Sequence, residues 1–332
     1  MKQFTVSENE AGQRFDKFLA KYMDLAPKSF FYKMLRKKNI TLNGKKAAGN
    51  EKLARGDVIK MFLSEETIEG FCSNRKKAIH TDQKLDILYE NHHVMLLNKP
   101  CGVLSQRAGK ADVSMVEHVI SHLLWTGEIT EEMLKTFRPA VCNRLDRNTS
   151  GILAAGKTLL GLQTLSGLFR ERTVHKFYLC IVKGVVKQQE ELSGWLFKDE
   201  ETNQVRIYRK EREGAKQIHT RYRPVAENGR ETLLEVELLT GRTHQIRAHL
   251  ASVGHPLFGD PKYGDAKLNK ALWEEYGLQG QLLHAYRLEM PVLSGEFADM
   301  SESCFYAPVP ELFLKIAGKR GLGTWQHGIP EV

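Results

Sequence analysis

The spacing of hydrophobic residues divides the first part of the chain into two short helices and a small sheet. In residues 15–23 apolar side chains recur near helical spacing, and residues 28–39 repeat this pattern. Residues 40–63 alternate apolar with polar side chains around Asn-Gly and Gly-Asp turns, as short strands do. We therefore expect a compact α+β domain over residues 1–63, followed by a linker at 64–83, where no period is sustained.

The pattern after Lys84 predicts a larger domain in which strands and helices are interspersed. Apolar runs of β type lie at residues 85–91, 93–100 and 219–239, and helical periods lie at residues 114–125 and 159–172. These elements do not alternate as regular βαβ units, which favours an α+β domain with a mixed, largely antiparallel sheet and flanking helices. We place this domain at residues 84–318, with a tail at 319–332.

Charge makes the first domain a candidate RNA-binding module. Between Leu25 and Asn50 there are seven Lys or Arg and no Asp or Glu, with aromatic residues interleaved. The whole chain carries a formal net charge of +9, which favours a polyanionic partner. Lys33, Arg36 and Lys37 are the candidate RNA contacts, and the alternative is that they only form the solvated face of the second helix.

Composition indicates an ordinary cytoplasmic protein. The chain has 332 residues, of which 42% are hydrophobic and 27% charged, enough to bury a large core in more than one domain. The first residues lack the apolar segment of a signal peptide, and no apolar run approaches the ~20 residues of a membrane span. The five cysteines contain no C-x-x-C pair, so we expect buried thiols without disulfides or a structural zinc site.

One stretch imitates a phosphate-binding loop. Residues 151–158, GILAAGKT, match G-x-x-x-x-G-K-[ST], but the charged and polar residues just upstream do not form the hydrophobic strand that this loop requires. The residues between the glycines favour a strand, and a loop that wraps phosphates needs small, flexible residues. We therefore predict a strand here, with Lys157 and Thr158 at the entry to a helix, and no nucleotide cofactor.

The histidines do not predict a metal site. His118 and His122 are four residues apart on an expected helix, but Val119 stands where H-E-x-x-H has its glutamate. His244 and its neighbours likewise lack a third ligand at a suitable spacing. No metal is expected.

Two charged clusters carry the candidate chemistry. In NRLDRNTSG, Asp146 lies between Arg144 and another arginine, and fixed positive charges favour an ionised carboxylate. Far downstream, GRTHQIRAH includes Arg247 and could bind phosphate or pair with Asp146. Between the clusters, HKFYLCIVKG places Lys176 and Tyr178 on one face of an expected strand. A surface ion pair and a buried core tyrosine are the plain alternatives.

Together these segments resemble the RluA family of RNA pseudouridine synthases. The resemblance runs from about residue 84 to 318 and rests on LLNKPCGVLS, NRLDRNTSGILAAGKT, HKFYLCIVKG, LLTGRTHQIRAHLASVGHPLFGDPKYG, LLHAYRL and FYAPVPELF. Asn143 departs from the usual His, which bears on subgroup and substrate. Residues 13–63 resemble the small alpha-L RNA-binding domain first seen in a small-subunit ribosomal protein; RFDKFL, the basic second helix, ITLNGKK and ARGDVIKMFL carry that likeness.

The resemblance implies isomerisation of uridine in RNA to its C-glycoside, without a metal, nucleotide or redox cofactor. It implies that Asp146 is the essential carboxylate, that Arg247 is its ion-pair partner, and that Tyr178 packs on the target base and takes the C5 proton. Ile246 would add apolar packing, and Arg144 would occupy the gap left by the extruded base. Whether Asp146 attacks as a nucleophile or removes a proton stays open.

The resemblance also implies a substrate, because members with such a first domain mostly act on large-subunit ribosomal RNA. Transfer RNA remains an alternative substrate. A ribosome-assembly factor that binds RNA without modifying it is the alternative from another functional class, and it should tolerate loss of Asp146. We expect the chain to act as a monomer.

Overall fold

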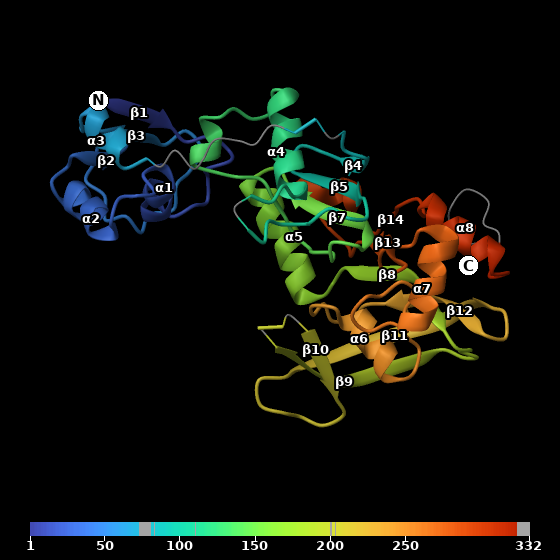
Figure 1. The fold of residues 1–332 in the computed structure, drawn as a ribbon. Coiled ribbons are helices and arrows are strands. Elements are labelled where there is room, and N and C mark those ends of the chain that lie inside the picture. The colour runs from blue at the N-terminus through green and yellow to red at the C-terminus, as the bar shows by residue number, and fades with distance from the viewer. Residues whose placement is uncertain (73–80, 83, 110, 200, 203, 324–332) are drawn as a thin grey trace.

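The chain forms two domains that touch over a small area (Figure 1). The computed structural model describes residues 1–72, 81–82, 84–109, 111–199, 201–202 and 204–323. Among these residues no helix is both long and apolar enough to cross a membrane.

The first domain combines a three-stranded antiparallel sheet with three helices. The strands are β1 (Lys2–Thr5), β2 (Ile40–Leu42) and β3 (Val58–Met61), and the helices are α1 (Phe15–Tyr22), α2 (Lys28–Arg36) and α3 (Glu65–Gly70). The order in the sheet is β1–β3–β2. Phe15 and Phe18 of α1 share one core with Phe31 and Leu35 of α2, so the helical spacing of apolar residues correctly predicted both helices.

The first domain extends further than we expected. Residues 64–83 were predicted as a linker, but α3 begins after Ser64, whose hydroxyl accepts a hydrogen bond from the backbone N–H of Thr67 at 3.2 Å. Ile68 of α3 is buried in the same core as α1 and α2. Helix α3 was missed because its six residues make fewer than two helical turns, too few for a repeat of apolar residues to be recognised. Residues 73–80 of the expected linker lie outside the described residues.

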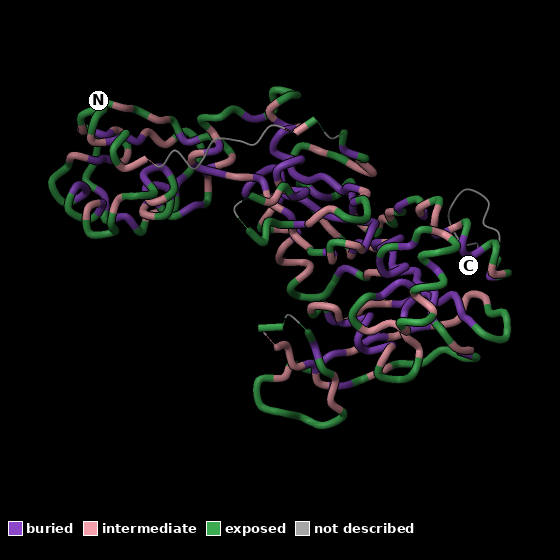
Figure 2. The backbone as a smooth tube through the Cα atoms, viewed as in Figure 1, coloured by how far each residue is buried: buried purple, intermediate pink, exposed green. Residues whose placement is uncertain are grey.

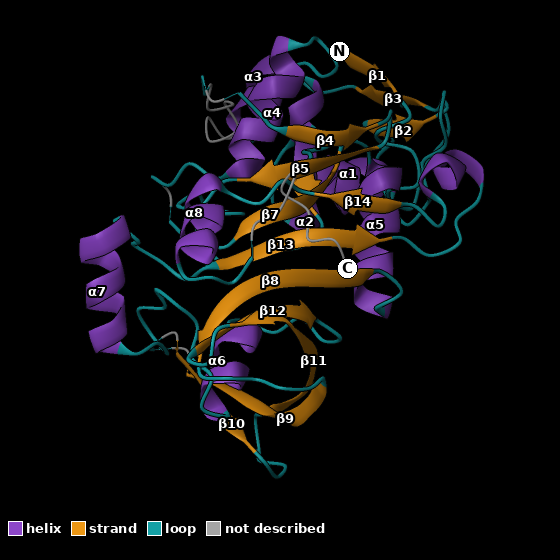
Figure 3. Ribbon diagram, turned by 90° about the vertical axis from the view of Figure 1, so that its right-hand side faces the viewer, coloured by secondary structure: helices purple, strands orange, loops and turns teal. Residues whose placement is uncertain are grey.

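The second domain is built on one 11-stranded sheet, the mixed and largely antiparallel sheet that the sequence predicted (Figure 3). The main path is β10–β9–β11–β12–β8–β13–β7–β5–β4, with β14 beside β13 and β6 beside β7. The only parallel pair among the described strands is β13 with β7. The strands are β4 (Ile87–Glu90), β5 (Val94–Lys99), β6 (Ala140–Val141), β7 (Ser150–Gly156), β8 (His175–Lys183), β9 (Glu190–Asp199), β10 (Gln204–Tyr208), β11 (Lys216–Glu227), β12 (Glu231–Glu237), β13 (Leu283–Glu289) and β14 (Cys304–Tyr306).

Helices cover both faces of this sheet. They are α4 (Met115–Trp125), α5 (Leu159–Glu171), α6 (Gln245–Ser252), α7 (Ala266–Tyr276) and α8 (Glu311–Lys319), with short 3-10 turns at Met133–Lys135 and Gly295–Met300. Alternate residues of β5 face opposite sides: Met95 and Leu97 pack with α4, whereas Val94 and Leu96 pack with α5. Five of the six residues of this strand are buried because a helix packs on each face. Figure 2 shows buried backbone in the interior of the molecule and exposed backbone at its periphery.

Strand β8 repeats this two-sided packing and places the candidate site. Tyr178 and Cys180 belong to the cluster that includes α6, whereas Leu179 and Ile181 pack with α7 and α8. Beyond β8 the sheet curls around α6, which lies within the curve of β12, β11, β9 and β10 (Figure 3). The start of α6 is thereby held against the middle of the sheet.

Gly151 permits the parallel pairing of β7 with β13. Its φ is +107°, and a Cβ atom there would lie 2.1 Å from the carbonyl oxygen of Ala285 on β13. Only glycine fits this approach without moving backbone. The first glycine of the GILAAGKT stretch therefore serves strand packing.

The cysteines and the end of the chain differ in part from expectation. The five cysteines, all of which lie in the described part of the chain, form no disulfide, but only Cys180 is fully buried, and Cys101 and Cys304 are exposed. The prediction of buried thiols was therefore wrong for the other four. The expected tail at 319–332 begins later in the structure, because Leu322 is buried in the core beside α8. Residues 324–332 of that tail lie outside the described residues.

Candidate active site

Asp146 lies on the loop between β6 and β7, with its side chain 26% exposed. Ser105 holds this loop from below: its hydroxyl donates to the carbonyl of Leu145 at 2.8 Å and accepts the N–H of Leu145 at 3.0 Å. The N–H of Thr149 donates to the Asp146 carbonyl at 3.0 Å and closes the turn. The backbone is thus fixed while the carboxylate stays accessible.

Arg247 at the start of α6 forms the predicted ion pair with Asp146. Its Nη1 lies 2.8 Å from Asp146 Oδ2, although the two residues are far apart in the chain. The other side of the guanidinium binds Asp260, with Nε 2.7 Å from Oδ2 and Nη2 2.8 Å from Oδ1. This planar two-point attachment leaves Nη1 aimed at the candidate catalytic carboxylate.

Asp260 is a functional residue that the sequence analysis missed. Its side chain is fully buried, and its Oδ1 accepts the backbone N–H groups of Lys262 and Tyr263 at 2.8 and 3.1 Å. Although burial opposes it, Arg247 and these N–H groups together lower the pKa of Asp260. Burial likewise lowers the pKa of Arg247, but Asp260 and then Asp146 outweigh burial and raise it overall. The pair therefore stays charged.

His244 is a second neighbour of Asp146, and it belongs to the basic GRTHQIRAH stretch that the sequence predicted as a possible partner of this carboxylate. Its Nε2 lies 4.0 Å from Asp146 Oδ2, and its Nδ1 lies 3.0 Å from the hydroxyl of Tyr263. It adopts a left-handed conformation with φ +53°, which turns the chain into α6. Burial lowers the pKa of His244 despite the nearby Asp146 carboxylate, so the imidazole is neutral near pH 7.

Tyr178 and Ile246 belong to the same buried apolar cluster as Leu145, the residue that precedes Asp146. Tyr178 is buried, and burial followed by the charge of Asp146 raises the pKa of its phenol. Lys176 lies two residues earlier on β8 and is half-buried, which lowers the pKa of its ammonium group. The strand therefore places an aromatic ring at the site with a cation at its edge, as the alternation predicted.

The remaining predicted contacts lie on exposed surfaces. Arg144 is exposed on the same loop as Asp146. Lys33, Arg36 and Lys37 are exposed at the end of α2 in the other domain. Helix α2 lies far from β7, the strand that follows the Asp146 loop (Figure 1). The structure thus brings Asp146, Arg247, Tyr178 and Ile246 together and separates the three basic residues from them.

Lys99 supports the Asp146 loop from β5. The buried ammonium donates hydrogen bonds to the carbonyl oxygens of Pro100, Val103 and Arg147 at 2.8, 2.8 and 3.0 Å. Burial lowers the pKa of Lys99 to about 8, although Cys101 and Asp146 oppose the shift. Sequence alone did not mark this residue, because its partners are backbone groups.

The GILAAGKT stretch is a strand followed by a helix, as predicted. Residues Gly151–Gly156 lie in β7, and the Lys157 ammonium is buried between the carboxylates of Glu90 and Glu128 at 2.7 and 2.6 Å. The Thr158 hydroxyl accepts the N–H of Gly161 at 3.0 Å and caps α5. These groups are committed to internal contacts and are not available to phosphates. Asn143, the departure from the family pattern, pairs with the backbone of β7.

This geometry defines a class of protein: an enzyme with an accessible carboxylate (Asp146), a fixed cation beside it (Arg247) and a buried tyrosine (Tyr178) on a strand of a mixed sheet. The family described as RNA pseudouridylate synthase matches residues 93–252, which include Asp146, Tyr178 and Arg247. In structure, the chain is similar to Human RNA Pseudouridylate Synthase Domain Containing 4, with a TM-score of 0.58 and 22% identity over 73% of this chain and 95% of that one. This likeness supports the fold.

Curated relatives establish the family. Ribosomal large subunit pseudouridine synthase C of Vibrio vulnificus (strain CMCP6) is 32% identical over 84% of this chain and 85% of its own length. The protein of the same name from Escherichia coli (strain K12) is 31% identical over 87% of this chain and 88% of its own. The chain therefore belongs to the RluA family of RNA pseudouridine synthases, as its motifs predicted, and is an isomerase.

Proposed function

We propose that this protein isomerises specific uridines of large-subunit ribosomal RNA and that Asp146 is its essential carboxylate. The observation that carries the proposal is the 2.8 Å ion pair between Asp146 and Arg247, held in place by buried Asp260. The names of the bacterial relatives, which specify the large ribosomal subunit, support the choice of RNA.

The reaction breaks the N1–C1′ glycosidic bond, turns the uracil and forms a C5–C1′ bond. C5 loses a proton and N1 gains one, so the product is an isomer of the substrate. No atom is gained overall and no electron is transferred to a second substrate, so we expect no cofactor. Asp146 acts in its ionised form, either by attack on the sugar or base or by removal of a sugar proton. Arg247 stabilises that anion and fixes its direction in a site that substrate binding closes to water.

Tyr178 packs against the target base, with Ile246 extending the apolar surface. Because the pKa of Tyr178 is raised, its phenol keeps its proton near neutral pH. A proton that leaves C5 toward this oxygen must therefore be passed on from the hydroxyl in the same step. The Asp146 carboxylate, whose charge acts on the Tyr178 phenol, is the nearby acceptor.

The target base must leave its stack before it reaches Asp146, which costs a few kcal/mol. Arg144, exposed beside the carboxylate, is placed to enter the gap, since a guanidinium stacks on bases and contacts phosphate. Lys176 binds the phosphate backbone of the RNA near the target base. Lys33, Arg36 and Lys37 hold a separate part of the RNA, so the first domain acts as an alpha-L type RNA-binding module that raises the local concentration of substrate.

We further propose that the protein acts as a monomer in the cytoplasm, the compartment of ribosomal RNA in the bacteria from which these relatives come. Each chain holds the whole proposed catalytic set, from Asp146 to Arg247, within one domain. A second subunit is therefore not required to complete the site.

Comparison of RNA substrates tests this function. The protein is incubated with large-subunit ribosomal RNA transcripts or transfer RNA transcripts, and pseudouridine is quantified by chromatography after digestion to nucleosides. We expect product in the ribosomal transcripts only. Product confined to transfer RNA would move the substrate to that class, and tight binding without product in either would favour a non-catalytic assembly factor.

A further inference from the structure

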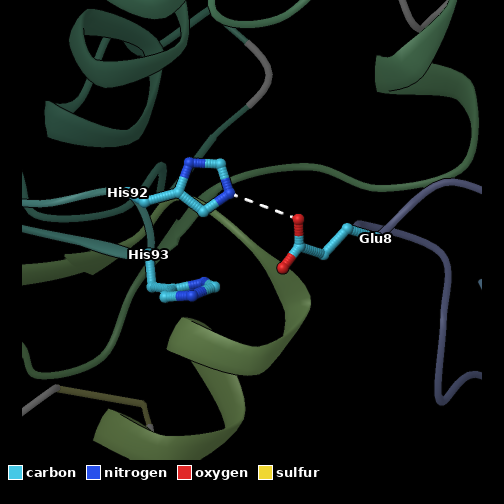
Figure 4. Close-up of side chains that lie close together, drawn as sticks. All are labelled: Glu8, His92 and His93. Carbon is cyan, nitrogen blue, oxygen red and sulfur yellow. Dashed lines mark ion pairs between the residues drawn. The ribbon is translucent and has the colours of Figure 1, made fainter. Parts of the chain in front are cut away.

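A cluster of metal-binding side chains lies where the two domains meet. Glu8 of the first domain faces His92 and His93, which precede β5 in the second (Figure 4). His92 Nε2 lies 3.4 Å from Glu8 Oε2, and one ligand atom from each of the three residues lies within 4.8 Å of the others. Because Glu8 is far from the histidines in the chain, sequence spacing did not reveal the cluster, and no metal was expected.

His93 is oriented as a metal ligand would be. Its side chain is buried, and its Nδ1 lies 2.9 Å from the Thr158 hydroxyl, which already accepts the Gly161 N–H. A proton on Nδ1 suits this partner and leaves the Nε2 lone pair free. Glu296 brings a carboxylate oxygen to 3.6 Å from that Nε2.

The surroundings have room and a suitable charge. A pocket of about 400 Å³ opens at the domain contact, lined by Glu8, His92 and Glu128 among others, with Arg55 on its wall. Lys157, whose buried ammonium lies nearby, is already paired with two carboxylates. The domains also touch beside it, where the Thr136 hydroxyl donates to the Glu10 carboxylate at 2.7 Å.

The geometry points to a zinc site in which His92, His93 and Glu8 bind one Zn²⁺, with Glu296 or water in the fourth position. Two imidazoles and a carboxylate are an established zinc ligand set. Bonds of about 2.1 Å require ligand atoms roughly 3.4 Å apart, so the set must contract slightly. Exposed His92 and Glu8 are free to shift. The ion would clamp the domains and fix the basic end of α2 relative to Asp146.

Zinc titration of the full chain tests this proposal. Protein stripped with a chelator is titrated with ZnCl₂ by calorimetry at pH 7.5. We expect one zinc per chain with micromolar or tighter affinity. Affinity should fall by at least about 10- to 100-fold in His92→Ala and in Glu8→Gln, because even the loss of a group that only orients a metal ligand costs this much. His175→Ala is the matched control. His175 also pairs with a surface glutamate, Glu237, at 2.8 Å, but it does not belong to a group of three metal-binding side chains among the described residues.

Three outcomes would overturn the proposal. Wild-type protein that takes up no stoichiometric zinc has no site, and binding that survives in both His92→Ala and Glu8→Gln lies elsewhere. Binding that depends on His92 but not on Glu8 would show that the ion does not join the domains. Circular dichroism of each variant confirms that folding is retained, which their exposed positions favour.

Discussion

At the scale of single residues, Arg247 binds two carboxylates whose tasks differ. Asp260 is buried and holds two nitrogens of the guanidinium, whereas Asp146 is accessible and receives only Nη1. The buried partner therefore serves as a positioning residue, and the accessible one can meet a substrate. Sequence motifs identified Asp146 and Arg247, but not Asp260, because its role depends on burial and backbone donors that no local pattern displays.

We predict that Asp260→Asn lowers kcat by about 10-fold or more with a smaller change in KM, because Arg247 loses its fixed orientation. Unfolding free energy at pH 7 should fall by about 3–5 kcal/mol, the usual effect of removing one partner of a buried pair. Asp265→Asn is the control, since its ion pair with Lys183 lies at the surface and Asn also caps helices. Steady-state kinetics and denaturant unfolding measure both effects.

The same pair predicts a pH dependence of stability. Because the folded pKa of Asp260 lies below its ordinary value of 3.8, its contribution is fully present above that pH. The contribution is lost as pH falls through the folded pKa. The difference in unfolding free energy between wild type and Asp260→Asn should therefore be constant from pH 7 to about 4 and shrink below. A difference that shrank between pH 7 and 5 would contradict this assignment.

Tyr178→Phe separates packing from proton transfer. The ring remains, so affinity for RNA should change less than about twofold, whereas release of the C5 proton should slow by about 100-fold or more. Filter binding and single-turnover release of tritium from C5 measure the two quantities. Equal rates in Tyr178→Phe and wild type would restrict this residue to packing.

At the scale of elements, alternation and helical spacing predicted part of the second domain: strands β4, β5, β7 and β8, the β11–β12 hairpin, and helices α4 and α5. The other strands and helices α6, α7 and α8 were not predicted. These patterns are local. The order of apolar and polar residues within a single strand or helix reflects which of its faces are buried. The pairing order of the sheet could not be derived in this way. The parallel contact of β7 with β13 joins segments far apart in the chain, and only Gly151 marks it.

Gly151→Ala should therefore destabilise the sheet. Its Cβ would lie 2.1 Å from backbone at a φ of +107°, so we expect a loss of about 3 kcal/mol or more. Gly318→Ala is the control: this glycine lies in α8 with open space around it, and alanine should be neutral or stabilising by up to about 1 kcal/mol. Thermal and denaturant unfolding compare the two. Near-equal stability of Gly151→Ala and wild type would mean that β13 moves away freely.

At the scale of the whole molecule, we infer that the first domain binds RNA and that the second domain carries out the chemistry. Their existence was predictable from the change of pattern near Lys84, but their contact was not, because it depends on side chains such as Glu8, Glu10 and Thr136 from distant segments. The basic end of α2 lies in one domain and the carboxylate in the other. Loss of the basic residues should therefore weaken capture of RNA and spare the catalytic step.

We predict that replacing Lys33, Arg36 and Lys37 together with glutamine raises Kd for ribosomal RNA and reduces the slope of log K against log salt by about 2–3. Single-turnover rates at saturating RNA should stay within about twofold. A matched variant replaces Lys267, Lys270 and Lys315, exposed lysines of α7 and α8, and should bind as wild type does. Equal weakening by both variants would indicate a general charge effect without a binding face on α2.

We propose that the Asp146 carboxylate is essential for isomerisation. Release of tritium from uridine C5 measures this requirement, because isomerisation must expel that hydrogen. Ribosomal RNA transcripts labelled at uridine C5 are incubated with wild-type protein or with Asp146→Asn, which preserves the shape of the loop, without added nucleotide or metal. We expect release by the wild type and a loss of at least about 1,000-fold in the variant, with RNA binding retained. Release by Asp146→Asn at the wild-type rate would contradict it.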